Sequence, residues 1–89
     1  MTARSLQLTF LEGRPVGAYL YFDTGERPAV ARTEERSRDL IVDFSEDGEP
    51  IGLEIISFGS DVPARVIRLL EELGVPPLSP QELSRLHVA

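Results

Sequence analysis

Residues 40–56 constrain the fold of this chain more than any other segment. At their centre, Asp47-Gly48 tolerates two successive residues at positive φ, as the type I′ turn of a tight β-hairpin requires. With this turn at the tip, one face of the hairpin carries three apolar pairs, Leu40 with Ile55, Val42 with Leu53 and Phe44 with Ile51. The other face pairs Ile41 with Glu54, Asp43 with Gly52 and Ser45 with Pro50. Because a slip of one residue would mix the two sets, the pattern specifies the register.

Three other segments show strand patterns. Residues 5–11 place Leu6, Leu8 and Phe10 on one face, and residues 17–22 are apolar on both faces, as in a buried central strand. A break at residues 12–15 separates these two strands, and a turn at residues 23–28 leads to a third strand at 29–35. An Arg36-Ser37 turn then joins it to the fourth strand, 38–44, and the fifth covers 50–56. Short connections throughout predict a five-stranded antiparallel β-meander.

The period of the apolar residues changes after the fifth strand. Five of them form one stripe of an amphipathic helix: Val62, Val66, Leu69, Leu70 and Leu73. Ser60 or Asp61 caps its start, Gly74 ends it, and charged residues take the opposite side: Arg65, Arg68, Glu71 and Glu72. A capping box, Ser79 with Glu82, predicts a second helix at about residues 80–87. The sequence therefore predicts a single α+β domain over residues 1–89, with a sheet at about 5–56 and helices at about 62–73 and 80–87, the first packed on one face of the sheet.

Composition excludes several classes of protein. The 89 residues include no cysteine, so disulfides and thiolate metal sites are ruled out. A net charge of −6 opposes binding to a phosphate backbone, and we expect no nucleic-acid partner. The chain starts without the apolar run of an export signal and has no apolar stretch of about 20 residues, the length that crosses a bilayer. We expect a cytoplasmic protein that does not enter membranes and carries no cofactor.

One face of the predicted sheet lacks a helix to cover it. An Arg36-Ser37 turn would align Arg32, Ile41 and Glu54 across that face, with Val30, Asp43 and Gly52 in the next row. The candidate interaction face is Tyr19, Tyr21, Arg32, Ile41, Asp43, Glu54 and Ile56. A half-apolar uncovered face usually has a partner, so we expect a homo-oligomer, a dimer in the simplest case, and a protein partner.

The same segments resemble a family of small prokaryotic proteins known as domain of unknown function 2283. The resemblance covers roughly residues 6–58 and rests on Tyr19 or Tyr21, Val30, Arg32, Thr33, Glu35, Asp43, Asp47, Gly48, Gly52, Glu54, Ile55 and Ile56. Family members usually carry an aspartate after the first strand and another entering the second, where this chain has Leu11 and Gly17. The family has no established activity, so the resemblance implies a fold and leaves function open. Some members of such small families look like partners of toxin-like proteins.

Two chemical alternatives share the hairpin. Asp43, Ser45, Asp47, Gly48 and Glu54 have the spacing of an EF-hand calcium loop, but their flanks have strand patterns, and Pro50 removes a backbone donor. Asp43 and Glu54 are also diagonal neighbours, so with Arg32 they could form a small-ligand or hydrolytic site. A ladder of ion pairs explains the same three residues.

Other residue types suggest no site. His87, the only histidine, lies in the last turn of the second predicted helix, where its charge suits the helix C-terminus. Serines in turns and at strand ends have no base in the pattern: Ser37, Ser45, Ser57 and Ser60. We therefore interpret the chain as a non-enzymatic interaction module without metal or cofactor, with the Arg32/Asp43/Glu54 site as the alternative.

Overall fold

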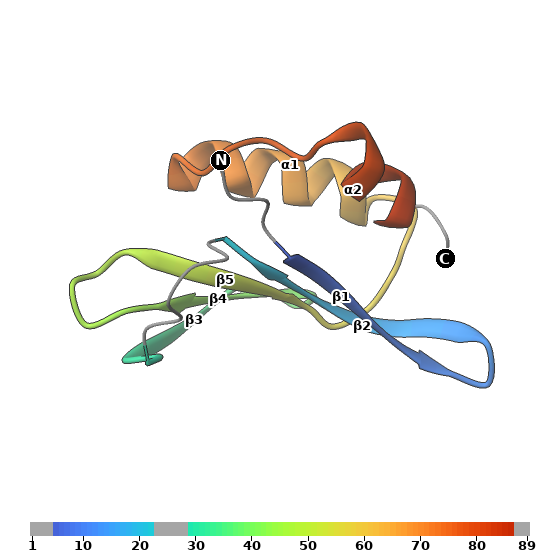
Figure 1. Cartoon of the computed structure of the whole chain (residues 1–89), viewed down its shortest axis with the longest axis horizontal. Coiled ribbons are helices and arrows are strands. Elements are labelled where there is room, and N and C mark those ends of the chain that lie inside the picture. The colour runs from blue at the N-terminus through green and yellow to red at the C-terminus, as the bar shows by residue number, and fades with distance from the viewer. Residues whose placement is uncertain (1–4, 23–28, 87–89) are drawn as a thin grey trace.

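The computed structural model describes residues 5–22 and 29–86, so the predicted turn at 23–28 and His87 lie outside the described residues. Five strands are followed by two helices: β1 (Ser5–Leu11), β2 (Arg14–Tyr21), β3 (Arg32–Ser37), β4 (Leu40–Phe44), β5 (Pro50–Ile55), α1 (Val62–Leu73) and α2 (Pro80–Leu86). All five strands form one antiparallel sheet, and both helices lie on the same side of it (Figure 1). The predicted α+β fold is confirmed.

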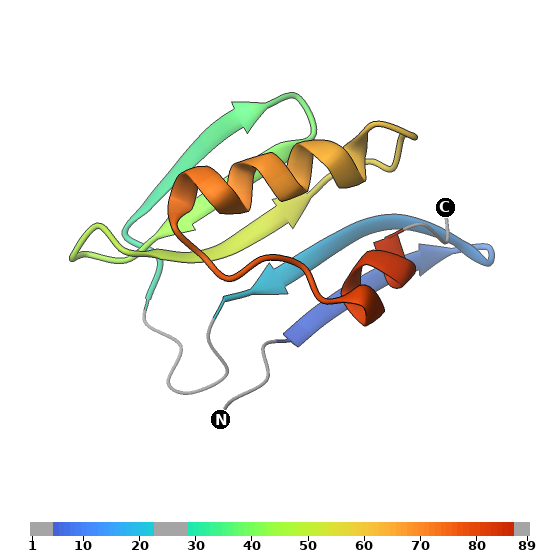
Figure 2. The ribbon, with the colours of Figure 1, turned by 90° about the horizontal axis from the view of Figure 1, so that it is seen from above.

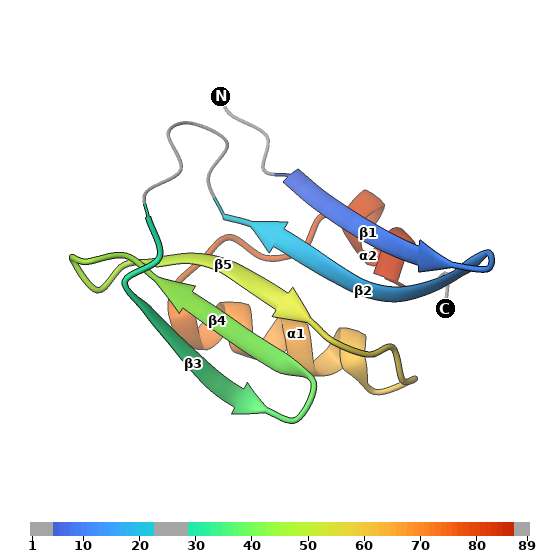
Figure 3. The same ribbon diagram turned by 90° about the horizontal axis from the view of Figure 1, so that it is seen from below.

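The order of the strands differs from the predicted meander. It is β1-β2-β5-β4-β3, so a β1–β2 hairpin joins a β3–β4–β5 meander through pairing of β2 with β5 (Figure 3). This order pairs Leu20 with Leu53 and Ala18 with Ile55, which places four buried residues in the middle of the sheet. Strand β3 has charges at four of its six positions, and it takes an edge, where charged side chains reach water.

The core lies between the sheet and the helices. Helix α1 lies over β4 and β5, and α2 lies over β1 and β2 (Figure 2). Both helices contribute to one cluster of buried side chains: Leu6, Ala18, Leu20, Leu40, Val42, Phe44, Leu53, Ile55, Val62, Val66, Leu69, Leu70 and Leu86. The predicted helical stripe therefore packs on the predicted face of the hairpin, and Leu86 anchors the short α2.

The β4–β5 hairpin has the predicted register but a different turn. Four predicted pairs are present: Leu40 with Ile55, Ile41 with Glu54, Val42 with Leu53 and Asp43 with Gly52. At the tip, Gly48 has φ 83° and donates its N–H to the carbonyl of Ser45, whereas Asp47 does not adopt positive φ. The tip is thus a turn with a single left-handed glycine. A register shift follows, so Phe44 pairs with Pro50 instead of Ile51.

The two-residue turn with two positive φ angles occurs between β1 and β2. Glu12 has φ 52° and Gly13 has φ 80°. Leu11 pairs with Arg14 across this turn, and Pro15 lies within β2. The predicted four-residue break is therefore only two residues long.

The third strand is displaced along the chain from its predicted position. It begins at Arg32 instead of residue 29, and its turn to β4 is Arg38-Asp39 instead of Arg36-Ser37. Thr33 consequently pairs with Asp43 and Glu35 with Ile41. A register shift between Glu35 and Ser37 accompanies this displacement.

The helix ends match the sequence signals closely. Gly74 ends α1 in the left-handed conformation with φ 71°. At the start of α2, Ser79 and Glu82 form both hydrogen bonds of a capping box. Asp61 occupies the N-cap of α1 without capping it through its side chain. Within the described residues, neither helix is long and apolar enough to cross a membrane.

Candidate functional site

The face of the sheet that the helices leave uncovered is the candidate site, and we call it the open face (Figure 3). The register places two rows of residues across it. The first row is Gln7, Tyr19, Glu54, Ile41 and Glu35; the second is Ser5, Tyr21, Gly52, Asp43 and Thr33. Thr9 and Gly17 continue the same alternation along β1 and β2. Ile56 directly follows β5 and lines the same hollow as Gly17, Tyr19 and Glu54. The open face comprises these thirteen residues.

A hydrogen-bond network joins three strands at the centre of the open face. The hydroxyl of Tyr19 donates to Oδ2 of Asp43 at 2.5 Å. The hydroxyl of Thr33 donates to Oδ1 of the same carboxylate at 2.8 Å. Hydrogen bonds to an ionised acceptor are among the stronger ones, so both carboxylate oxygens are held in place.

Gly52 makes room for this network. Tyr19 pairs with Glu54, one row away from Asp43, so its ring must cross β5 diagonally to reach the carboxylate. A Cβ atom on residue 52 would lie closer than 3.0 Å to the phenol ring and hydroxyl of Tyr19. Glycine at this position therefore lets the ring lie directly on the backbone of β5.

Burial and a carboxylate partner perturb the phenol of Tyr19. Loss of hydration, followed by the hydrogen bond to Asp43, raises the pKa of Tyr19 well above its ordinary value of 10.0. The ring of Tyr21 lies 4.5 Å from that of Tyr19, centroid to centroid, at an angle of 46°. The two tyrosines thus form a fixed aromatic pair beside the network.

Arg32 does not belong to the open face, contrary to the sequence-based prediction. It pairs with Phe44, whose side chain is buried under the helices, and its guanidinium carbon lies 4.3 Å from the centre of the Phe44 ring. The predicted row of Arg32, Ile41 and Glu54 was wrong because the β3–β4 turn comes two residues later than expected. Thr33 occupies the place beside Asp43 that was assigned to Val30.

The other predicted residues lie together on the open face. They are Tyr19, Tyr21, Ile41, Asp43, Glu54 and Ile56. The sequence analysis missed Thr33 as a partner of Asp43, although Thr33 was among the residues of the family resemblance. Thr33 and Glu35 are two residues apart in one strand and so share a face, and this spacing could have placed Thr33 on the open face.

The charged residues of the open face are all acidic. Asp43, Glu54 and Glu35 are its charged members, and none of its thirteen residues is basic. Beside Glu54 a hollow of about 290 Å³ opens over Gly17, lined also by Tyr19 and Ile56. The open face combines fixed aromatic rings, exposed aliphatic groups and negative charge.

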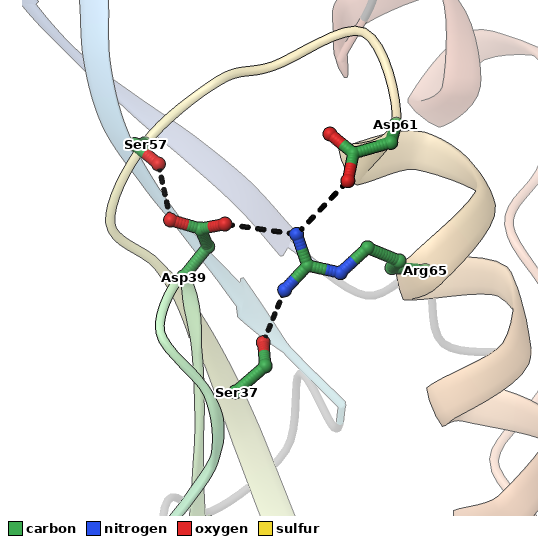
Figure 4. Close-up of polar contacts among 5 residues, drawn as sticks. All are labelled: Ser37, Asp39, Ser57, Asp61 and Arg65. Carbon is green, nitrogen blue, oxygen red and sulfur yellow. Dashed lines mark hydrogen bonds and ion pairs between the residues drawn. The ribbon is translucent and has the colours of Figure 1, made fainter.

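A second polar cluster, which the sequence analysis missed, links α1 to the sheet (Figure 4). Arg65 donates to Asp39 in the β3–β4 turn at 2.8 Å, to Asp61 at 3.3 Å and to Ser37. Ser57 donates to the other oxygen of Asp39 at 2.6 Å. These donors, Ser57 first and then Arg65, lower the pKa of Asp39 below its ordinary value, and the carboxylates raise that of Arg65.

This cluster corrects one prediction about α1. Arg65 was assigned to the solvent side of the helix with Glu72, yet it reaches back to the sheet. Glu72 lies 3.7 Å from Arg36 of β3. In this cluster Arg65 of α1 contacts Asp39 of the β3–β4 turn and Asp61 at the start of its own helix, and we interpret the cluster as structural.

The geometry also bears on the two chemical alternatives. Residues 43–54 form β4, β5 and their turn, so the helices that flank an EF-hand loop are not there. Within residues 5–22 and 29–86, no three His, Cys, Asp or Glu side chains are placed to hold a metal ion. Asp43 and Glu54 share the open face as predicted, but the arginine assigned to bind a substrate beside them lies on the other side of the sheet.

A comparison with protein families finds a match. Residues 18–58 match the model described as "Protein of unknown function (DUF2283)". The match runs from within β2 to just beyond β5 and contains all four residues that build the network: Tyr19, Thr33, Asp43 and Gly52. No match was found among curated proteins or among solved structures. Residues 18–58, the segment that forms most of the open face, therefore belong to the DUF2283 family of proteins of unknown function.

Proposed function

We propose that this chain is a non-enzymatic, cytoplasmic interaction module that binds a partner protein through the open face and also self-associates. The observation that carries the proposal is a sheet with helices on one face and an ordered, half-apolar surface on the other. Uncovered faces that combine aromatic and aliphatic groups are typical of binding surfaces.

The Tyr19–Asp43–Thr33 network supports a binding role over a catalytic one. Both oxygens of Asp43 already accept hydroxyl protons from within the chain. A tyrosine ring that is fixed before binding loses little side-chain entropy when a partner covers it. Rigid aromatic groups of this kind are typical anchors of protein interfaces.

The charge of the open face indicates the chemistry of the partner. Asp43, Glu54 and Glu35 leave it negative, and the whole chain has a net charge of −6. A partner surface with arginine or lysine beside apolar groups would complement it and would associate faster at low salt.

An affinity capture with matched variants tests this proposal. The wild-type chain, expressed in its native host as bait, should retain a basic companion in stoichiometric amount. Glu54→Lys should lose that companion, because it reverses a charge within the open face. Glu71→Lys makes the same charge reversal at an exposed position of α1, and this variant should retain the companion.

The two variants also define failure. A companion that binds Glu54→Lys as well as wild type would contradict the assignment of the open face. If wild type and both variants capture nothing, the part of the proposal that concerns a partner protein is wrong. Titration of the purified companion against each variant then gives the loss of affinity directly.

A further inference from the structure

The two edges of the sheet differ sharply in charge. Strand β3 forms one edge and reads Arg-Thr-Glu-Glu-Arg-Ser. Its Arg32 and Arg36 form ion pairs with Glu34, and Arg36 also with Glu72 of α1. Strand β1 forms the other edge and reads Ser-Leu-Gln-Leu-Thr-Phe-Leu, without a charge or a proline. No described strand lies beyond β1 (Figure 3).

An edge of this composition is open to strand pairing. Charged side chains and prolines are the usual means of blocking edge pairing, and β1 has neither of them. Its residues Gln7 and Thr9 are exposed, and near the hairpin tip Phe10 and Leu11 are 54% and 64% exposed. A strand added here would pair with the outward N–H and C=O groups of β1, which pair with no strand among residues 5–22 and 29–86, and would cover apolar surface.

We propose that two copies of this chain associate through antiparallel pairing of β1 with β1, so that the two sheets become one continuous sheet. This inference rests on the self-association included in the proposed function. When a strand pairs with its own copy about a twofold axis, the same backbone N–H and C=O groups form hydrogen bonds in both copies. The helices of both copies then lie on one side of the joined sheet, and the two open faces form one surface.

Charge favours this seam over the other ways in which two copies could meet. An open face placed on an open face would bring Glu35, Asp43 and Glu54 of each copy together without a basic residue between them. The β1 strand carries no charge, so its pairing brings no charged side chains of the two strands face to face. A neutral seam also gives a foreign partner no charge pattern to recognise, which favours a second copy as the occupant.

Two variants of equal net charge test the proposal. Gln7→Lys/Thr9→Lys adds two positive charges to the β1 edge, which takes the net charge from −6 to −4. Glu35→Lys adds the same two units at the β3 edge, in the same row as Gln7, and also gives −4. Light scattering at micromolar concentration should give twice 9.9 kDa for wild type and Glu35→Lys, and 9.9 kDa for the β1 variant.

Cysteine cross-linking locates the contact independently. Because the chain has no cysteine, single Gln7→Cys, Thr9→Cys and Glu35→Cys variants each contain one thiol. Mild oxidation should give disulfide dimers with a β1 variant much faster than with Glu35→Cys, since thiols of a paired strand lie within bonding range.

Each outcome has a definite meaning. A dimer that survives in the β1 variant, or that is lost in Glu35→Lys, overturns the edge assignment while self-association stands. A wild-type chain of 9.9 kDa overturns both, and leaves partner binding through the open face to be judged by its own capture experiment.

Discussion

Tyr19 can take its observed position because Gly52 has no Cβ atom. The ring lies across β5 where a side chain would otherwise stand, and its hydroxyl meets Asp43 on the next strand. Position 52 thus controls the central contact of the open face without contributing a functional group.

We predict that Gly52→Ala destabilises the protein and detaches Tyr19 from Asp43. The added methyl group overlaps the ring, and overpacking of this kind costs about 1–3 kcal/mol. Chemical denaturation should show a lower unfolding midpoint. Gly17→Ala on the same face is the control, because its methyl group would meet only the Ile55 carbonyl at 3.4 Å. Equal midpoints for the two variants would refute the packing argument.

The phenol of Tyr19 should keep its proton at alkaline pH. Of the two tyrosines in the chain, the Tyr21→Phe variant retains only Tyr19, so its phenolate absorbance reports one group. Ionisation should occur well above the ordinary pKa of 10.0, and addition of Asp43→Asn should lower the midpoint. A midpoint at 10.0 in the folded protein would show that the network does not form.

The same shift has a defined effect on stability. The folded-state pKa of Tyr19 is raised, so its contribution is complete below pH 10.0 and is lost as the pH rises toward the folded-state value. Tyr19→Phe should remove this alkaline loss of stability.

At the scale of elements, Arg65 fastens α1 to the β3–β4 turn through Asp39. The pKa of Asp39 is lowered by Ser57 and Arg65, so its contribution is present above the ordinary value of 3.8 and is lost as the pH falls below it. We predict that Asp39→Asn is less stable than wild type at neutral pH and that the difference narrows on acidification. Denaturation midpoints measured across the acid range check this.

A neighbouring arginine provides the control for that contact. Arg65→Met should lower the midpoint at neutral pH, whereas Arg68→Met, on the same helix, should leave it nearly unchanged. Arg68 has no ion pair with the residues that the structure describes. Equal effects of the two substitutions would mean that Arg65 acts through general helix charge.

Local sequence patterns predicted the strands and helices better than they predicted the turns that connect them. The alternation of Leu40, Val42 and Phe44 and the helical stripe of α1 follow from burial, and the structure has both. The sequence near the turn does not decide between Arg36-Ser37 and Arg38-Asp39, because the turn that forms also depends on contacts with distant segments. Arg65 of α1 makes such contacts: it donates hydrogen bonds to Ser37 in β3 and to Asp39 in the turn.

At the scale of the whole molecule, the net charge of each copy opposes the association that we propose for β1. Near the pI of about 4.6 the repulsion between copies vanishes, but the uncharged edge is unchanged. We predict that the wild-type dimer dissociates less readily on dilution as the pH falls toward this value. Light scattering of a dilution series should show Glu35→Lys behaving in the same way toward its own pI, whereas Gln7→Lys/Thr9→Lys, with the same net charge, should stay monomeric. Equal behaviour of the two variants would place the contact elsewhere.

The strand order could not be predicted from neighbouring segments. Hairpins follow from turn residues, but the pairing of β2 with β5 joins strands between which two others lie in sequence. This pairing places Leu20 beside Leu53 and Ala18 beside Ile55. From the sequence alone, apolar residues of other strands would be equally suitable neighbours for β2. Of the open face, the β4 and β5 residues could be foreseen and the β3 residues could not.

The β2–β5 junction has a consequence for how the chain is made. During synthesis the first hairpin leaves the ribosome with no strand to lie against, since its neighbour is the last strand to emerge. Productive assembly must therefore wait until residue 55 is free, and the slow event in folding should be the closure of this long loop.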